Sequence, residues 1–138
     1  MKKAIFIVSF AAVIVVCAVF SVFFFCSSSV VNVSNDTSAE LTYIYDDKNI
    51  KTTLEDNDLN ELCAMFEGKK TYLISPFDTP SCGFDENVSV KIGNSVFMPA
   101  CDTCTTVKTG FVYFNISDKE RGRLEEIFAK YGATFPCL

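Results

Sequence analysis

The sequence predicts an α+β fold: an N-terminal membrane helix, then a small domain with a mostly antiparallel sheet and two helices. Three observations lead to this prediction. Residues 4–26 form an unbroken uncharged run. Further along, short stretches of alternating apolar and polar residues are separated by turn signals, which is typical of antiparallel strands. Two other segments carry apolar residues at helical spacing. The expected element order of the domain is β-β-α-β-β-β-β-β-α.

The N-terminal run follows two lysines, Lys2 and Lys3, and is 23 residues long. As a helix it would extend roughly 34 Å, enough to cross a hydrocarbon core of about 30 Å. This length favours an uncleaved anchor over a cleaved signal peptide, whose apolar core is shorter. Cleavage near residues 26–29 remains the alternative and would yield a secreted domain. The lysines place residues 1–3 in the cytoplasm, so either interpretation puts the rest of the chain outside.

The segment after the run changes character. Residues 27–40 are rich in Ser and Asn, which predicts a flexible linker and a folded domain over residues 41–138. All 17 acidic residues and 10 of the basic residues lie after position 30, so this part of the chain has a formal net charge of −7. Such a domain repels phosphate backbones, so nucleic acid is not an expected partner. The expected partners are the membrane, through the N-terminal helix, and an unidentified protein or small molecule.

Seven strands are predicted within the domain. They cover residues 41–45, 50–54, 71–75, 88–92, 95–98, 105–108 and 111–116. Turn signals stand between several of them, at residues 46–49, at Gly93-Asn94 and at Thr109-Gly110. Sequential hairpins of this kind favour an antiparallel sheet.

Two helices complete the predicted domain. The apolar face of the first carries residues at i, i+3, i+4 and i+7, namely Leu59, Leu62, Cys63 and Phe66. Gly68 is its expected C-terminal cap. The second begins with a capping box formed by Ser117 and Glu120 and ends at Gly132. Its apolar face carries Leu124, Ile127, Phe128 and Tyr131.

Five of the seven cysteines lie in the predicted domain. Cys63 falls on the apolar face of the first helix, where a cysteine is expected to pack as a small hydrophobic residue. The other four lie in loops or at element ends: Cys82, Cys101, Cys104 and Cys137. In a small extracytoplasmic domain such a set predicts two disulfides, with three pairings open.

Two alternatives use the same four cysteines. As thiolates, Cys82, Cys101, Cys104 and Cys137 would complete a tetrahedral zinc site, although ribbon-type sites normally use two close pairs. Cys101 and Cys104 alone would form the dithiol of a thiol–disulfide oxidoreductase. That chemistry requires a helix N-terminus or positive charge to lower a thiol pKa. Here β-branched residues follow Cys104, and Asp102 adds negative charge between the cysteines.

The chain contains no histidine, which excludes Ser-His and Cys-His catalysis. None of its six glycines forms a Gly-x-Gly phosphate loop. We therefore expect no catalytic residues, no cofactor and no enzymatic activity, with zinc and the dithiol as the alternatives. The expected function is that of a membrane-anchored, extracytoplasmic interaction module stapled by disulfides.

A resemblance supports the same location. The segments Ser81-Cys82-Gly83-Phe84, Ala100-Cys101-Asp102-Thr103-Cys104, Tyr131-Gly132 and Phe135-Pro136-Cys137 resemble those of small uncharacterised exported proteins of Gram-positive gut bacteria. The resemblance covers residues 81–138. It implies an exported or membrane-anchored protein with a shared four-cysteine framework, and it implies no mechanism.

Overall fold

The computed structural model describes residues 13–19, 21, 29–33, 38–73 and 80–137. Its strands are β1 (Ala39–Tyr45), β2 (Lys48–Thr53), β3 (Ser89–Ile92), β4 (Ser95–Pro99), β5 (Thr106–Thr109) and β6 (Val112–Asn115). Its helices in the domain are α2 (Asp56–Phe66) and α3 (Asp118–Lys130). The six strands form one sheet in the order β2-β1-β3-β4-β5-β6, with every neighbouring pair antiparallel. The predicted α+β class is confirmed.

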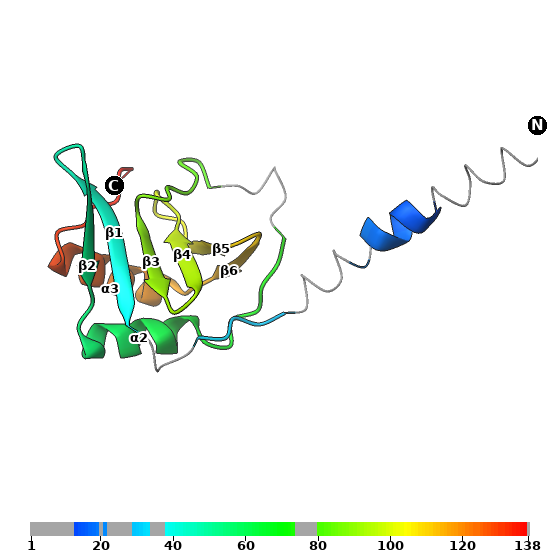
Figure 1. The fold of residues 1–138 in the computed structure, drawn as a ribbon, viewed down its shortest axis with the longest axis horizontal. Coiled ribbons are helices and arrows are strands. Elements are labelled where there is room, and N and C mark those ends of the chain that lie inside the picture. The colour runs from blue at the N-terminus through cyan, green and yellow to red at the C-terminus, as the bar shows by residue number, and fades with distance from the viewer. Residues whose placement is uncertain (1–12, 20, 22–28, 34–37, 74–79, 138) are drawn as a thin grey trace, which may run out of the picture.

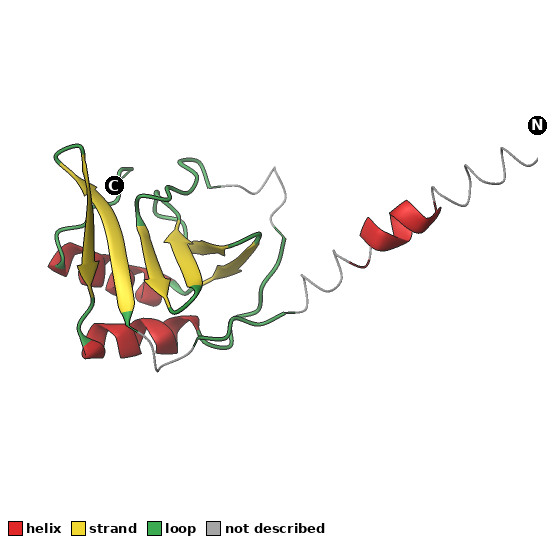
Figure 2. Cartoon of the chain, in the orientation of Figure 1, coloured by secondary structure: helices red, strands yellow, loops and turns green. Residues whose placement is uncertain are grey.

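The two helices cover one face of the sheet, with α3 behind the strands and α2 along their lower end (Figure 1). The strands, helices and connecting loops are distinguished in Figure 2. Burial alternates along β1: Ala39, Leu41 and Tyr43 are buried, whereas Ile44 is exposed. One face of the strand therefore supplies the core and the other meets solvent, as the alternating sequence predicts.

One predicted strand, residues 71–75, is absent as a strand from the part of the chain that the structure describes. Tyr72 instead pairs with Tyr113 of β6 in an isolated bridge, through N–H···O distances of 2.8 and 2.9 Å. Residues 74 and 75 lie outside the described residues. Among the described residues 71–73, Tyr72 alone forms backbone hydrogen bonds with β6, so this β-prone sequence covers the edge of the strand at that position.

The hairpin between β1 and β2 turns at Asp46 and Asp47, inside the predicted turn at residues 46–49. Both aspartates have positive φ, of 50° and 58°. Two successive residues of this conformation match the right-handed twist of paired strands, and aspartate tolerates it better than most residues.

The predicted helices both form. Four residues expected on the core face of α2, Leu59, Leu62, Cys63 and Phe66, are all buried. The capping box of α3 is present, because the Ser117 hydroxyl accepts the Glu120 N–H at 3.3 Å and the Ser117 N–H donates to Glu120 Oε2 at 2.6 Å. The capping box thereby satisfies the backbone N–H groups of Ser117 and Glu120 at this helix start.

Three rings form what we call the phenylalanine core: Phe66 of α2, Phe97 of β4 and Phe114 of β6. Their centroids are 4.9, 5.5 and 6.2 Å apart, and each ring is fully buried. Edge-on and tilted contacts of this kind add to the stabilisation from burial alone. This core joins α2 to the middle and the far edge of the sheet.

Parts of the predicted linker pack against the domain. Val31 and Val33 are buried in the core, and the Val31 N–H donates to the Lys69 carbonyl at 2.9 Å. β1 begins at Ala39, two residues before the expected domain start. Val31, Val33 and Ala39 of this stretch therefore reach the core, although its polar composition predicts a linker.

Most of the predicted membrane segment, including residues 4–12 and 22–26, lies outside the described residues. Residues 13–19 are helical, and their side chains are exposed. Among the helices that the structure describes, none has the length and apolarity needed to cross a bilayer.

Candidate functional site

The loop before β3 is brought against the Cys101–Cys104 loop by backbone pairing. Residues 80–83 form a turn in which the Gly83 N–H donates to the Pro80 carbonyl at 3.0 Å. Gly83 has φ of +68°, a conformation that favours glycine. Its carbonyl accepts the Cys101 N–H at 3.1 Å, and Phe84 forms a bridge with Ala100. This pairing places Cys82 next to the Cys-x-x-Cys loop.

Asp102 fastens the same two loops through its carboxylate. Oδ2 accepts the N–H and the hydroxyl of Ser81, both at 2.9 Å, and Oδ1 accepts the Cys104 N–H at 2.9 Å. Burial by itself raises the pKa of this carboxyl, but the donors from Cys104, Ser81 and Cys82 outweigh it. The pKa of Asp102 falls to about 2. The buried side chain therefore carries its charge at neutral pH and depends on these donors for compensation.

Arg121 of α3 holds the other side of the Cys101–Cys104 loop. Its guanidinium is buried and donates to the carbonyls of Ala100 and Asp102 at 3.0 and 2.9 Å. It also pairs with Glu125 at 2.6 Å and lies 4.3 Å from the centroid of the Phe135 ring. One side chain thus joins the loop, the helix and the segment that follows the helix.

The four-cysteine cluster, Cys82, Cys101, Cys104 and Cys137, lies where these segments meet. Three of its members, all but Cys104, line an open hollow of about 530 Å³ together with Phe84, Asp85, Glu86, Asn87 and Pro136. The fold thus brings Cys82, Cys101 and Cys137, which the sequence predicts as site residues, to one place. All described cysteines are free thiols, and no two of them lie at disulfide-bonding distance.

The surroundings of the cluster suppress thiolate formation. Burial raises the pKa of Cys101, and the hydrogen bond to the Asp102 carboxylate raises that of Cys104. The hydrogen bond to Cys82 raises the pKa of Cys137 to about 11. The Cys101–Cys104 loop also leads into a strand, so no helix N-terminus offsets these effects.

The zinc alternative requires several of these side chains to converge on one point. Among the described residues, no three Cys, Asp or Glu side chains are arranged so that they could hold a metal ion. The four cysteines are neighbours, but their sulfur atoms do not surround a common centre here.

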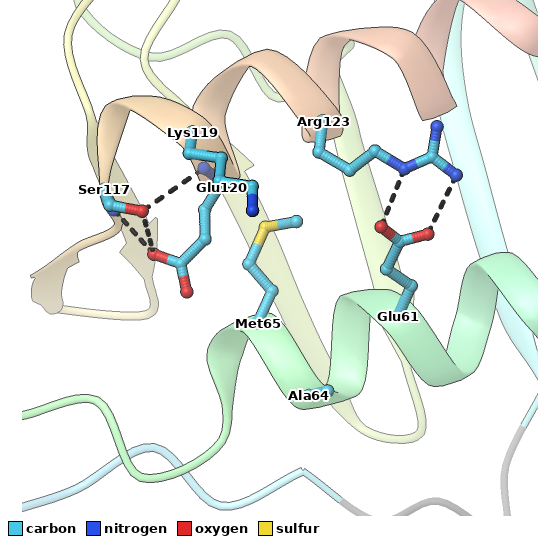
Figure 3. Close-up of a pocket in the computed structure, with 7 residues that line it drawn as sticks. All are labelled: Glu61, Ala64, Met65, Ser117, Lys119, Glu120 and Arg123. Carbon is cyan, nitrogen blue, oxygen red and sulfur yellow. Dashed lines mark hydrogen bonds and ion pairs between the residues drawn. The ribbon is translucent and has the colours of Figure 1, made fainter.

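A second hollow, of about 440 Å³, lies between α2 and α3 (Figure 3). Glu61 and Arg123 face each other across it at 2.7 and 2.9 Å, and Met65 lies between the helices. Glu120, on its rim, pairs with Lys69 at 2.8 Å. Because Arg123 pairs with Glu61 and Lys69 pairs with Glu120, these charges already neutralise one another. We therefore interpret this groove as a helix–helix contact.

Sequence reasoning missed the two charged residues that organise the site. The sequence pattern gives Asp102 only as a charge that disfavours a thiolate, and it assigns Arg121 no role. Arg121 did carry a signal, since it precedes Leu124 by three positions and Phe128 by seven. A charged residue in line with an apolar helix face is expected to be buried and paired.

Comparison of the chain found no matching family model, no matching curated protein and no matching solved structure.

Proposed function

We propose that this protein is an extracytoplasmic interaction module, held at the cell membrane by residues 4–26 and stapled by disulfides, with no catalysis of its own. The observation that carries the proposal is the uncharged 23-residue run after Lys2 and Lys3, followed by an acidic domain. An oxidising exterior is the setting in which four loop cysteines of a small domain form disulfides.

The interior of the domain supports a role at its surface. Among the described side chains, every buried nitrogen and oxygen has a hydrogen-bond partner. No buried polar group is therefore left to receive a ligand in the core. Contact with a partner, a protein or a small molecule, is expected on the exposed face of this acidic domain.

The raised thiol pKa values support a structural role for the four-cysteine cluster. A dithiol enzyme works through a thiolate that is populated near neutral pH. Cys101 and Cys104 have the opposite tendency, because burial and the Asp102 carboxylate both disfavour their charged forms. Thiols with a raised pKa are better suited to stable structural disulfides than to repeated thiol–disulfide exchange.

The location is tested with a single reporter cysteine at Phe111, which is 91% exposed in the turn between β5 and β6. Cells expressing the full-length Phe111→Cys chain are treated with a membrane-impermeant maleimide. We expect labelling above that of the unsubstituted chain, and recovery of the protein in the alkali-washed membrane fraction. The matched control is Phe111→Cys in a chain without residues 2–26, which should label only after lysis.

Labelling of the full-length chain only after lysis would overturn the proposed location. Recovery in the medium, with residues 1–26 missing from the intact mass, would support the secreted alternative.

The two chemical alternatives have their own outcomes. Stoichiometric zinc in the purified full chain, with four alkylatable thiols, would favour the metal-binding domain. Insulin-reducing activity that is lost in Cys101→Ser would favour the oxidoreductase. Under our proposal neither is observed, and alkylation before reduction blocks four fewer thiols than alkylation after it.

A further inference from the structure

The segment that leads into the domain is fixed to it from Ser29 onward. The Thr71 N–H donates to the Ser29 carbonyl at 2.9 Å. The Val31 N–H donates to the Lys69 carbonyl at 2.9 Å, and the Val31 carbonyl accepts the Gly68 N–H at 3.0 Å. The Val31 side chain is buried in the core. The chain is therefore part of the folded domain well before β1 begins.

This fixed segment follows closely after the predicted membrane segment. The uncharged run ends at Cys26, and only Ser27 and Ser28 stand between it and Ser29. Because consecutive Cα atoms are 3.8 Å apart, the Cα atoms of Cys26 and Ser29 are separated by at most about 11 Å. The headgroup region on each side of a bilayer is roughly 6 Å thick. With residues 4–26 across the membrane, as the proposed function requires, Ser29 lies in the headgroup region or just above it.

Four side chains beside Ser29 form what we call the entry surface: Val30, Lys70, Tyr72 and Tyr113. Val30 pairs with Lys70, and Tyr72 pairs with Tyr113, in two isolated antiparallel bridges. Side chains of bridge partners leave on the same face, and so do those of residues two apart in extended chain. Because Val31 points into the core, Val30 and its bridge partner point outward. The four side chains thus share the outward face.

The entry surface has the composition of a membrane–water interface. Val30 is 56% exposed, Lys70 is exposed, and the two half-buried tyrosine rings lie 6.4 Å apart. Tyrosine is enriched at headgroup level because its ring is amphipathic. Lysine lays its apolar stem along such a surface and keeps its charge among the headgroups. An exposed lysine also complements the phosphates of lipid headgroups.

The opposite edge of the sheet differs in charge and is distant. β6, which carries Tyr113, is one edge strand and β2 is the other. Five strand spacings of about 4.8 Å separate them, roughly 24 Å in all. The turn that leads into β2 carries Asp46 and Asp47, and Figure 1 shows it on the far side of the domain from residues 29–33. Negative charge at that turn is repelled by anionic lipid.

From these observations we infer that the entry surface rests on the lipid headgroups of the outer leaflet, held there by the short connection to residues 4–26. The β6 edge of the sheet then points toward the bilayer and the β2 edge points away from it. The inference deepens the proposed function and rests on it, since it requires the membrane anchor. It leaves the helices and the β2 edge open to other partners.

The test uses tryptophan fluorescence, because the chain contains no tryptophan of its own. Tyr72→Trp places the reporter on the entry surface. Tyr45→Trp is the matched control, since Tyr45 is 66% exposed at the end of β1, beside the β2 edge. Each full-length variant is purified in detergent and reconstituted into vesicles of equal parts phosphatidylcholine and phosphatidylglycerol, with a nitroxide on the headgroup of part of the phosphatidylcholine. We expect quenching at position 72 to be several-fold stronger than at position 45.

Flotation of the same vesicles in a density gradient reports whether the protein is bound to the membrane. Flotation with equal quenching at the two positions, or with none at either, would overturn the inference and leave the anchor standing. Emission at position 72 that shifts with protein density but is not quenched would mean that a second copy covers this surface, which also overturns it. Protein that does not float would overturn the proposed anchor and the inference together.

An insertion tests the part played by the short connection. About ten Gly and Ser residues, which span roughly 17 Å on average, are placed between Ser28 and Ser29 of the Tyr72→Trp chain. We expect quenching at position 72 to fall toward the value at position 45. The same insert between Met1 and Lys2 is the control and should leave the quenching unchanged. Full quenching with the insert after Ser28 would contradict the inference that the connection holds the surface on the lipid.

Discussion

The phenylalanine core and the four-cysteine cluster belong to one domain, but different interactions hold them. In the core, regular elements meet through the rings of Phe66, Phe97 and Phe114. Around the cluster the backbone is irregular, and two buried charged residues, Asp102 and Arg121, bind its loops. The comparison shows that a domain of this size can complete its hydrophobic core and still depend on polar groups, or on covalent bonds, to order its loops.

The largest effect is expected in the phenylalanine core. Phe97→Ala removes a ring that is 1% exposed and touches both other rings. We expect a loss of about 3–5 kcal/mol in the free energy of unfolding, from lost burial and the cavity left behind. Chemical denaturation of the reduced protein measures it. Phe111→Ala is the control, since its ring is exposed; an equal loss there would refute the assignment.

The next effect is expected at Arg121. Replacement by Met keeps most of the apolar stem but leaves the carbonyls of Ala100 and Asp102 without these donors. Unsatisfied buried acceptors of this kind cost about 2–4 kcal/mol in total. Denaturation midpoints would report the loss. Arg123→Met, two residues along and half exposed, should change stability much less because its ion pairs are in solvent.

Asp102 is expected to make the stability of the cluster region depend on pH. Its pKa is about 2 in the folded protein, below the ordinary value of 3.8. The stabilisation is therefore fully present above the ordinary value and is lost as pH falls toward 2. It amounts to about 2 kcal/mol. Denaturation between about pH 5 and pH 2 should show a steeper decline for the wild type than for Asp102→Asn.

Other carboxyls with lowered pKa, including Asp58 and Glu120, contribute to the decline in both proteins, so only the difference between wild type and variant is informative. Parallel curves would rule out the role given to Asp102.

The smallest effect is expected at Gly122, on the exposed side of α3 and outside both regions. A Cβ added there meets nothing within 4 Å, and the residue is helical. Gly122→Ala should therefore stabilise the protein by about 0.5–1 kcal/mol through the unfolded state and helix propensity. Gly132→Ala is the opposing control, because φ is +86° at Gly132. Stabilisation by both would contradict this explanation.

Local patterns in the sequence determined most of the regular structure. The capping box of Ser117 and Glu120, the buried face of α2 with Cys63, and six of the strands follow from residues a few positions apart. Such signals are readable because a helix repeats every 3.6 residues and a strand every two. The 23-residue run after Lys2 and Lys3 likewise needs only its length and composition to predict a membrane segment.

Tertiary structure alone decided the rest. Val31 pairs with Lys69, Tyr72 pairs with Tyr113, and Cys82 lines the same hollow as Cys137. Each contact joins segments 38 to 55 positions apart, and no local period encodes such a meeting. The burial of Asp102 and Arg121 likewise depends on tertiary structure, because a charge can be buried only where the fold supplies its partners. The sequence thus singles out the four cysteines as candidates, and the packing around Asp102 and Arg121 brings their segments together.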